Sequence, residues 1–363
     1  MKVCHMTSVH NSLDDRIFYK ECVSLAAAGY DTYLVAPGKS FVEKSVKVIG
    51  VGTYKVNRIQ RMFVLSNIVY KKALEIDADI YHFHDPELLP YGIKLKRKGK
   101  KVIFDSHEDV PSQILAKEWI PLSIRKSISF VFEKYQKKIS RKLDCIVTAT
   151  PYIANVFKAY GANAAVVRNF PILEEIVVDN DDYAEREKVI CYAGGLTEQR
   201  GIRELIKLSS EIEIKLLLAG DIDNEYKKEL IKTEKVDNVV FMGILNRRGI
   251  KDLYKKSKIG MALLHPTPNH VNALAIKLFE YMGAGLPIVC SDFPLWKEIV
   301  ENTGCGICVN PLNVSKAKES VEFLLDNPKV AKRMGEKGQA LVQSKFNWKI
   351  EKENLLEIYL SVQ

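Results

Sequence analysis

The sequence predicts an α/β protein built from two doubly wound parallel-sheet domains. Its 363 residues and 47% hydrophobic content are enough for two cores of ordinary domain size. Short apolar runs alternate with helical stretches in two successive series. Such alternation indicates parallel sheets that helices cover on both faces.

The first series of apolar runs predicts strands at 2–6, 32–36, 46–51, 80–83, 102–105, 145–148 and 165–167. A stretch with Pro171 and an acidic cluster from Asp179 to Asp182 then indicates a hinge. The second series predicts strands at 189–193, 214–219, 239–241, 259–264, 287–290 and 306–309. Because ligands bind at the carboxyl ends of such strands, two open sheets predict a cleft between them.

The sequence indicates a cytosolic protein. The N-terminal MKVCHMTSVH has too short an apolar run for a signal peptide, and no stretch approaches the roughly 18 apolar residues of a membrane span. Four of the seven cysteines lie in or beside apolar runs, as buried thiols do, so disulfides are not expected. Cys305 and Cys308 form a CxxC without the second pair of a zinc site, and we expect no redox or metal role for them.

Positive charge is concentrated in the first half of the chain. The net charge is +9, and residues 1–170 hold 27 Lys and Arg against 16 Asp and Glu. The run from Lys94 to Lys101 and the run from Trp119 to Leu143 carry much of it, and the second also contains Trp, Ile, Leu and Phe. This mixture favours an anionic membrane surface as partner. A solvated basic helix on the core is the alternative, and nucleic acid is not expected because no reader motif accompanies the charge.

The stretch from His265 to Val300 places a cation and a carboxylate near one helix N-terminus. It predicts a buried strand, a polar loop, a helix and a second strand, at 259–264, 266–272, 274–284 and 288–290. Free amides and the dipole at such a helix start favour a phosphate. Lys277 falls in the first turn and Glu280 on the same face, so both would line one cleft.

An ordinary structural role explains the same residues. Asn272 would be the N-cap of the helix, with Lys277 and Glu280 on its solvated face. The spacing alone leaves both interpretations open.

The stretch resembles the donor-site signature of retaining glycosyltransferases of family 4, which have the two-domain fold called GT-B, and the resemblance extends over nearly the whole chain. The signature has two glutamates separated by seven residues, then small residues, G, x, P and a short apolar strand. Glu280 matches the second glutamate, which in the family binds the ribose of the nucleotide. Asn272 stands where the first glutamate holds the donor sugar, so it can hydrogen-bond a sugar hydroxyl but brings no charge.

The resemblance implies the domain organisation. An N-terminal Rossmann-like domain for the acceptor and the membrane (1–170) would precede a linker (171–186) and a C-terminal Rossmann-like donor domain (187–345). Residues 346–363 resemble the final helix of the family, which crosses back to the first domain. The donor site would also include Gly194, Gly195, Ala273, Leu274 and Ala275.

Arg200 is expected near a helix N-terminus, where its guanidinium and the helix dipole reinforce each other. The family has an Arg and a Lys in this loop; Arg200 stands at the Lys position and Gly195 at the Arg position. With Lys277, Arg200 would still give two positive charges to a diphosphate. Negative charge grows on this leaving group as the sugar bond breaks, so stabilising it is the main electrostatic task. A surface ion pair of Arg200 with Glu198 or Glu204 is the alternative.

The resemblance also implies a mechanism without an enzyme nucleophile. The acceptor attacks the face that the diphosphate leaves, and a diphosphate oxygen takes its proton. Catalytic roles then fall to Arg200, Lys277 and His107, which ends a strand and matches the family histidine that touches the donor sugar. Glu108 and Asp109 are weaker expectations for contacts to sugar or acceptor hydroxyls.

Other polar residues in the first half have simple local explanations. His82 and His84 have a spacing that suits a metal, but Asp85 as N-cap and Pro86 as first helical residue explain the segment without one. We expect His84 at most to line the cleft.

The loop after the first strand lacks the glycine pair of many relatives. Asp14, Asp15 and Arg16 in this loop are weak expectations for acceptor contacts. Capping of the next helix by Asp14 or Asp15 explains them equally well.

No metal and no cofactor is expected. Two DxD patterns, at 77–79 and 221–223, are similar to the metal-binding pair of transferases of the other main fold. However, Asp221 lies in a turn where this family commonly has glycine, and Arg200 and Lys277 already supply the countercharge. The substrate would be a nucleotide-diphosphate sugar, with a UDP-sugar as the commonest choice.

These observations predict a metal-independent retaining glycosyltransferase, peripheral on the inner membrane face. It would add a sugar to a lipid-linked glycan in bacterial surface polysaccharide synthesis. Two alternatives stay open: a nucleotide-sugar 2-epimerase would consume the donor without an acceptor, and a non-catalytic subunit would bind the donor and turn nothing over. An NAD-dependent dehydrogenase is disfavoured because no GxGxxG follows an expected strand.

Overall fold

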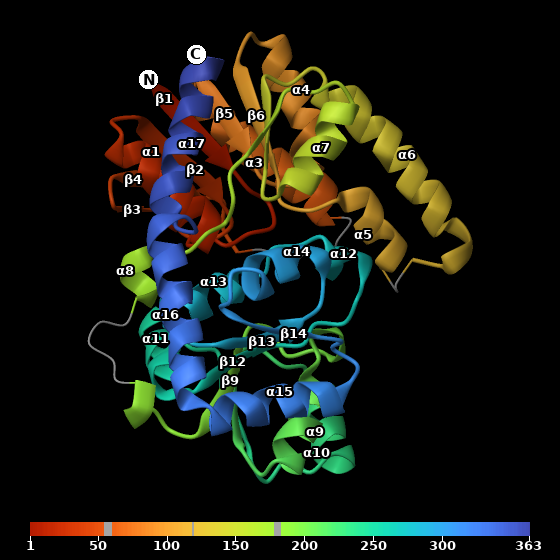
Figure 1. Cartoon of the computed structure of the whole chain (residues 1–363). Helices are drawn as coiled ribbons and strands as arrows, with labels where there is room; N and C mark the ends of the chain where they lie inside the picture. Colours follow the sequence, from red (N-terminus) through yellow and green to blue (C-terminus); the bar gives the residue numbers. More distant parts are fainter. Residues whose placement is uncertain (54–59, 118–119, 178–182) are drawn as a thin grey trace. The chain divides into compact units, whose positions relative to one another are not determined.

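A computed structural model of the chain describes residues 1–53, 60–117, 120–177 and 183–363. These residues form two compact units (Figure 1). Unit 1 comprises Met1–Asn169 and Trp348–Gln363, and unit 2 comprises Phe170–Asn347. Trp119 and the acidic cluster at 179–182 lie outside the described residues.

Unit 1 is built on an eight-stranded sheet with the strand order β3-β4-β2-β1-β5-β6-β7-β8. Its strands are β1 (Lys2–Met6), β2 (Asp31–Ala36), β3 (Phe41–Glu43), β4 (Val46–Gly50), β5 (Ile80–Phe83), β6 (Lys101–Ser106), β7 (Cys145–Thr148) and β8 (Ala164–Val166). In the described chain all its ladders are parallel except β3 with β4. The predicted α/β fold is confirmed, with one added edge strand. The sequence missed β3 because three partly exposed residues give no clear pattern.

Helices pack on this sheet, and the last helix of the chain belongs to the same unit. They are η1 (Asp15–Cys22), α1 (Val23–Ala27), η2 (Arg61–Leu65), α3 (Ser66–Ile76), η3 (Pro86–Leu88), α4 (Leu89–Arg97), α5 (Val110–Ala116), α6 (Leu122–Ser140), α7 (Pro151–Ala159) and α17 (Trp348–Val362). Trp348 Nε1 donates to Ser24 Oγ at 2.9 Å, and Glu351 accepts from the Arg168 amide at 2.8 Å. These bonds hold α17, blue in Figure 1, against the first part of the chain.

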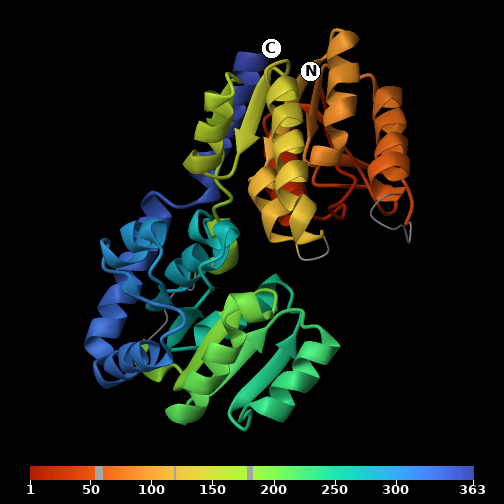
Figure 2. The same cartoon turned by 90° about the vertical axis from the view of Figure 1, so that its right-hand side faces the viewer.

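Unit 2 contains a six-stranded sheet with the order β11-β10-β9-β12-β13-β14, and all its described ladders are parallel. Figure 2 shows helices on both sides of these strands. The strands are β9 (Val189–Ala193), β10 (Lys215–Ala219), β11 (Val239–Gly243), β12 (Ile259–Ala262), β13 (Ile288–Ser291) and β14 (Gly306–Val309). The helices are α8 (Leu173–Ile176), η4 (Tyr183–Glu185), η5 (Glu198–Arg200), α9 (Ile202–Glu211), α10 (Asn224–Thr233), α11 (Arg247–Lys256), α12 (Pro268–Val271), α13 (Ile276–Gly283), α14 (Pro294–Trp296), η6 (Lys297–Glu301), α15 (Val314–Asp326) and α16 (Pro328–Ser344).

The segment expected to be a linker, 171–186, is packed onto unit 2 where it is described. Ile176 of α8 touches α13 so closely that a Cβ on Gly283 would lie 2.2 Å from it. The preceding Phe170 packs its ring against Phe279 and Phe346, with centroids 4.7 and 5.4 Å away. Apolar burial therefore makes the start of this segment part of the unit 2 core.

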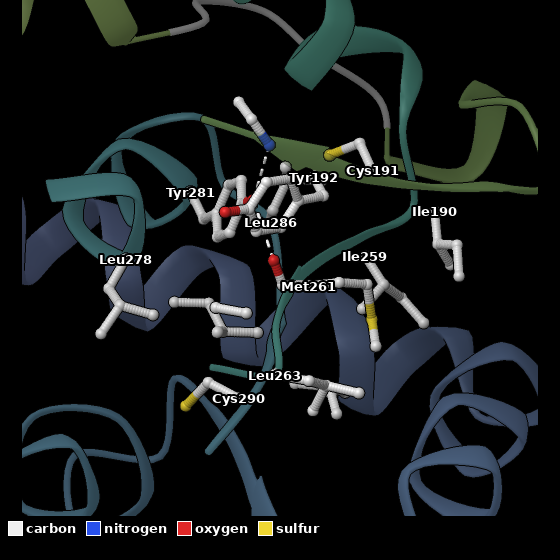
Figure 3. Close-up of a cluster of buried hydrophobic side chains, with 14 of the residues drawn as sticks. Ile190, Cys191, Tyr192, Ile259, Met261, Leu263, Leu278, Tyr281, Leu286 and Cys290 are labelled. Atoms are coloured by element: carbon white, nitrogen blue, oxygen red, sulfur yellow. Dashed lines mark hydrogen bonds between the residues drawn. The ribbon is translucent and has the colours of Figure 1, made fainter. Parts of the chain in front are cut away.

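Tyr281 fixes α13 on the sheet of unit 2 (Figure 3). Its hydroxyl donates to the carbonyl oxygen of Met261 at 3.1 Å and accepts from the amide of Ala193 at 3.4 Å. Gly260 makes room for the ring, because a Cβ there would lie 2.5 Å from it. The helix thus contacts both β9 and β12, and its first turn lies at the carboxyl end of β9.

Candidate functional site

The start of α13 differs from the expected one. The helix begins at Ile276, and its N-cap is Ala275, which has no side chain to cap it. Asn272 is exposed in the turn that ends the short helix α12, so it does not cap α13. The capping role that was the alternative for Asn272 is therefore not observed, because Pro268 starts a separate helical turn inside the predicted polar loop. Among the described residues no side chain caps the first amides of α13, which leaves them available to an anion.

The structure brings Lys277 and Arg200 together beside Gly194. The Lys277 ammonium lies 3.8 Å from the centroid of the Tyr192 ring. A Cβ built on Gly194 would lie 3.0 Å from Lys277 Nζ and 3.3 Å from Arg200 Nη1. Arg200 ends η5 immediately before Gly201, the N-cap of α9, as the sequence predicted for a helix start. Two cations therefore converge on one point at the carboxyl end of β9.

Arg200 does not form the surface ion pair that was the alternative. Glu198 pairs instead with Arg203 at 3.0 Å, and Glu204 pairs with His265 at 3.1 Å. Within the described ranges neither Arg200 nor Lys277 forms a salt bridge with a carboxylate. Two neighbouring cations without an anion are typical of a site that binds one.

The environment of Lys277 disfavours its own charge. Only 8% of the residue is exposed. Burial, and then the positive charge of Arg200, hold the pKa of Lys277 well below its usual range, although Glu280 opposes this shift. A bound anion would reverse the effect, because it favours the charged ammonium.

Glu280 lies one turn after Lys277 on α13 and is half-buried. Its Oε2 accepts a hydrogen bond of 2.7 Å from the hydroxyl of Tyr254 on α11. Tyr254 was not expected at the site, because it lies in a helical stretch with no motif around it. This tyrosine orients one oxygen of the carboxylate.

The glycines after β9 form a tight turn. Gly194 has φ +135°, and the Gly194 carbonyl oxygen would lie 1.8 Å from a Cβ on Gly220. Gly195 is less constrained, since the nearest atom to its added Cβ would be 3.7 Å away. The carbonyl oxygen of Ala273 accepts a hydrogen bond from Trp296 Nε1 at 2.8 Å. Ala273 and Leu274 are half-buried and precede α13. The backbone thus approaches the cations closely at Gly194 but not at Gly195.

The two DxD patterns have local roles. Asp223 caps α10 by accepting from two amides of its first turn. Asp77 pairs with Lys100 at 2.6 Å. In the described part of the chain neither pattern belongs to a group of side chains that could hold a metal.

In unit 1, His107 follows β6 and faces a buried ion pair. Its Nδ1 lies 3.4 Å from Asp105 Oδ1, and Asp105 Oδ2 accepts from Arg16 Nε at 2.9 Å. Burial lowers the pKa of His107 to about 3, so the imidazole is neutral near pH 7. Its Nε2 has no hydrogen-bond partner among the described residues. His107 thus keeps a buried, unpartnered ring nitrogen beside the ion pair of Arg16 and Asp105.

Two of the residues expected to contact an acceptor, Arg16 and Asp14, already bond other groups of unit 1. Arg16 is 4% exposed, because it bonds Asp105 and the carbonyl oxygen of Val167 inside the unit. Asp14 caps η1 through the amides of residues 16 and 17, which agrees with the capping alternative. Arg16 and Asp14 thus have structural roles that leave them little reach toward an acceptor.

The remaining acceptor candidates lie at helix starts. Asp15 occupies the first turn of η1, and Asp109 caps α5 by accepting from Ser112. Glu108 is exposed and accepts from Gln113. Asp85 does hold the N-cap position of η3, but its side chain bonds Thr7 and Ser8 instead of capping that helix. Of the three remaining candidates, Asp15 and Glu108 are exposed and Asp109 is half-buried.

Three buried residues of unit 1 were not expected at a polar site. His5, Glu21 and Tyr359 lie against His82 and His84 in one polar cluster. His5 and Tyr359 sit in largely apolar runs, where their polar groups were the available signal. Glu21 follows Lys20 in a helix and gave no such signal.

Comparisons with known proteins agree with this architecture. Residues 174–341 match the family model described as Glycosyl transferases group 1, and residues 16–171 match Glycosyltransferase Family 4. The two parallel-sheet units and these matches define a glycosyltransferase of the GT-B class. Each half of the chain thus matches a glycosyltransferase model, the first half that of Family 4, and the expected resemblance is confirmed.

Individual relatives are distant. An uncharacterized glycosyltransferase of Methanocaldococcus jannaschii is 28% identical over 179 residues, which are 48% of this chain and 45% of that protein. The chain thus spans about half the length of such a curated relative. Sucrose-phosphate synthase from Thermosynechococcus elongatus has a TM-score of 0.79 at 17% identity, over 100% of this chain and 99% of that one. Anabaena HepE in complex with UDP-glucose has a TM-score of 0.74 at 14% identity, over 99% and 100%. These two likenesses show the fold alone.

Proposed function

We propose that the chain is a retaining glycosyltransferase that transfers a sugar from a nucleotide-diphosphate donor to a hydroxyl of a glycan acceptor. The convergence of Lys277 and Arg200 beside Gly194 carries this proposal. A diphosphate supplies the negative charge that both cations lack. As the bond from the sugar to the diphosphate breaks, the growing charge on the leaving oxygen is stabilised by both side chains.

Other groups of the same unit complete the donor site. The uncapped amides of α13 bind a phosphate oxygen, together with the backbone at Gly194 and Gly195. Glu280, oriented by Tyr254, accepts hydrogen bonds from the ribose. Asn272 with the adjoining 273–275 backbone contacts the donor sugar from the loop before the helix.

The chemistry needs no enzyme nucleophile. The acceptor oxygen bonds the anomeric carbon on the face that the diphosphate leaves, and its proton moves to a diphosphate oxygen. In unit 1, the imidazole of His107 is neutral at pH 7, which suits a hydrogen bond to a sugar hydroxyl. No metal is required in this proposal, because the two cations take the place of one.

The decisive experiment measures nucleotide binding and transfer in Lys277→Met and Arg200→Met. UDP is tried first, since HepE was solved with UDP-glucose, followed by GDP, ADP, CMP and dTDP, each with and without EDTA. Each variant should weaken diphosphate binding at least about tenfold, as loss of a charge-assisted hydrogen bond does. Lys207→Met, which removes an exposed cation from α9, is the matched control and should bind as the unchanged protein does.

Unaltered binding in both site variants, with folding intact, would refute the site. Consumption of the donor sugar without an acceptor would indicate an epimerase or hydrolase instead. Binding with no turnover against any acceptor would indicate a non-catalytic subunit. The anomeric configuration of the product, read by NMR, tests retention.

We further propose that unit 1 docks to an anionic membrane surface through α6. Ile124, Ile128, Val131 and Tyr135 form an exposed apolar stripe at the spacing of one helix face. The core-facing side of the same helix is partly polar, with Ser129 and Gln136 buried. On α6, apolar side chains face solvent while polar ones face the core. This arrangement indicates a surface that binds an apolar partner, such as a lipid bilayer.

Basic residues on the same helix favour a bilayer that contains anionic lipids. Lys126, Lys134 and Lys138 are exposed on α6, and Lys134 lies over the Phe130 ring at 4.4 Å. Each basic residue near an anionic surface adds about 1 kcal/mol of attraction. The other expected segment contributes less, because Lys96 pairs with Asp144 and Lys100 with Asp77.

Such docking suits a lipid-linked acceptor at the inner face of the membrane, as in surface polysaccharide assembly. No helix in the described ranges is long and apolar enough to cross a bilayer. The contact would therefore be peripheral and reversible by salt.

A further inference from the structure

Unit 1 buries a cluster of four metal-ligand side chains. His5 on β1 and His82 on β5 face each other in the parallel register, His84 follows β5, and Glu21 lies on η1. All four side chains are 0% exposed. One ligand atom from each lies within 4.8 Å of the others.

The atoms are arranged around one carboxylate oxygen. Glu21 Oε2 lies 3.9 Å from His5 Nδ1, 4.0 Å from His82 Nδ1 and 3.8 Å from His84 Nε2. Neither oxygen of Glu21 accepts a hydrogen bond from a described residue, although Arg16 Nε lies 3.0 Å from Oε1. Arg16 also pairs with Asp105 at 2.9 Å, so two buried carboxylates share one guanidinium, and a further positive charge beside Glu21 would be stabilised.

We propose that His5, Glu21, His82 and His84 bind a divalent transition-metal ion, zinc being the best match. Three imidazoles and one carboxylate are typical zinc ligands. Tetrahedral ligands at zinc bond lengths lie about 3.3 Å apart. The shortest contact here, between His5 Nδ1 and His84 Nε2, is 2.9 Å, and the carboxylate contacts reach 4.0 Å. Because the four ligand atoms lie within 4.8 Å of one another, binding requires individual pairs to close by up to about 1.5 Å.

The surrounding groups suit a metal site. His84 Nδ1 lies 3.6 Å from Asp105 Oδ2, and His5 Nε2 lies 3.0 Å from the Tyr359 hydroxyl. Carboxylates and hydroxyls in these positions orient ligand imidazoles and raise their basicity. The ion replaces the proton shared by His5 and His84, and it releases His82 Nδ1 from its 2.8 Å bond to Tyr359.

The ion has a structural role in this proposal. It joins β1, β5 and η1 directly beside Arg16 and Asp105, the pair that faces His107. It is separate from the donor site of unit 2, which uses Lys277 and Arg200. Because the ligands are fully buried, the ion enters while the chain folds.

The test uses the full chain, unfolded with a chelator and refolded with Zn²⁺, with Co²⁺ or with EDTA. After dialysis, we expect one ion per chain by elemental analysis, and a tetrahedral visible spectrum for the Co²⁺ form. The unfolding temperature should be lower for the chain refolded in EDTA. Absence of a stoichiometric ion, or an octahedral Co²⁺ spectrum, would overturn the proposal without any variant.

Variants separate a metal site from a hydrogen-bonded histidine cluster. Glu21→Gln and His82→Asn should lose stoichiometric binding, whereas His265→Asn in unit 2 should retain it. Tyr359→Phe is the discriminating control, because it removes hydrogen bonds from His5 and His82 but no ligand. A metal site predicts full occupancy in this variant. Equal metal content in Glu21→Gln and the unchanged protein would place the ion elsewhere and refute the site.

Discussion

Tyr254 donates a hydrogen bond of 2.7 Å to Oε2 of Glu280, from a helix 26 residues earlier in the chain. Burial, and then the nearby carboxylate, hold the pKa of Tyr254 well above its usual range. The phenol therefore stays protonated at all working pH values and acts as a permanent donor. It fixes the carboxylate that we assign to the ribose.

Removing the Tyr254 hydroxyl should weaken binding of the nucleoside part of the nucleotide only. We expect Tyr254→Phe to lower UDP affinity at least about tenfold, because a hydrogen bond to a charged group contributes about 1.5–3 kcal/mol. Affinity for inorganic pyrophosphate should not change, since the cations remain. Calorimetric titration with both ligands tests this, and an equal loss for both would show that Tyr254 instead supports the cation pair.

Diphosphate binding should take up a proton. The pKa of free Lys277 is depressed by burial and by Arg200, and a bound diphosphate raises it. Between the free and the bound pKa, affinity therefore falls as pH rises, and it is constant below the free pKa. Titrations in buffers of different ionisation enthalpy measure the uptake. The variant Lys277→Met should abolish the proton uptake that Lys277 causes. An unchanged proton uptake in this variant would assign the proton to another group.

Two adjacent glycines should differ sharply in tolerance. Gly194→Ala places a Cβ 3.0 Å from Lys277 Nζ at φ +135°, whereas Gly195→Ala meets nothing closer than 3.7 Å. We expect Gly194→Ala to cost about 1–3 kcal/mol of stability and to weaken diphosphate binding at least tenfold. Gly195→Ala is the matched control for folding and should stay near the unchanged protein in denaturant unfolding. Equal effects at both positions would contradict the close approach at Gly194.

Charges placed on the apolar stripe of α6 should prevent membrane docking. The double change Ile128→Glu and Val131→Glu removes two side chains worth about 1.5–3 kcal/mol each when buried. We expect binding to vesicles with phosphatidylglycerol to fall more than about tenfold in sedimentation, with nucleotide affinity unchanged. Ile231→Glu makes the same change at an exposed residue of α10 in unit 2 and should have no effect. Retained vesicle binding in the double variant would move the docking surface elsewhere.

The architecture was readable from local sequence. Apolar runs, the helical periods between them and their Gly and Pro breaks depend on near neighbours, so the strand series of both sheets were predicted. Lys277 and Glu280 lie one turn apart, and helix geometry alone put them on adjacent positions. The errors were local as well: β3 was too short to detect, and Pro268 started a helical turn that displaced Asn272 from the cap.

The sequence by itself determined the α/β class, the family resemblance and the identity of the two cations. Only the tertiary structure set Tyr192 beneath Lys277, joined Tyr254 to Glu280 and gathered His5 with His84, which lie 79 positions apart. Local patterns specify which residues are buried, because burial follows the period of one element. Which buried side chains meet depends on strand order and on how helices pack across the sheet, and these are properties of the whole folded unit.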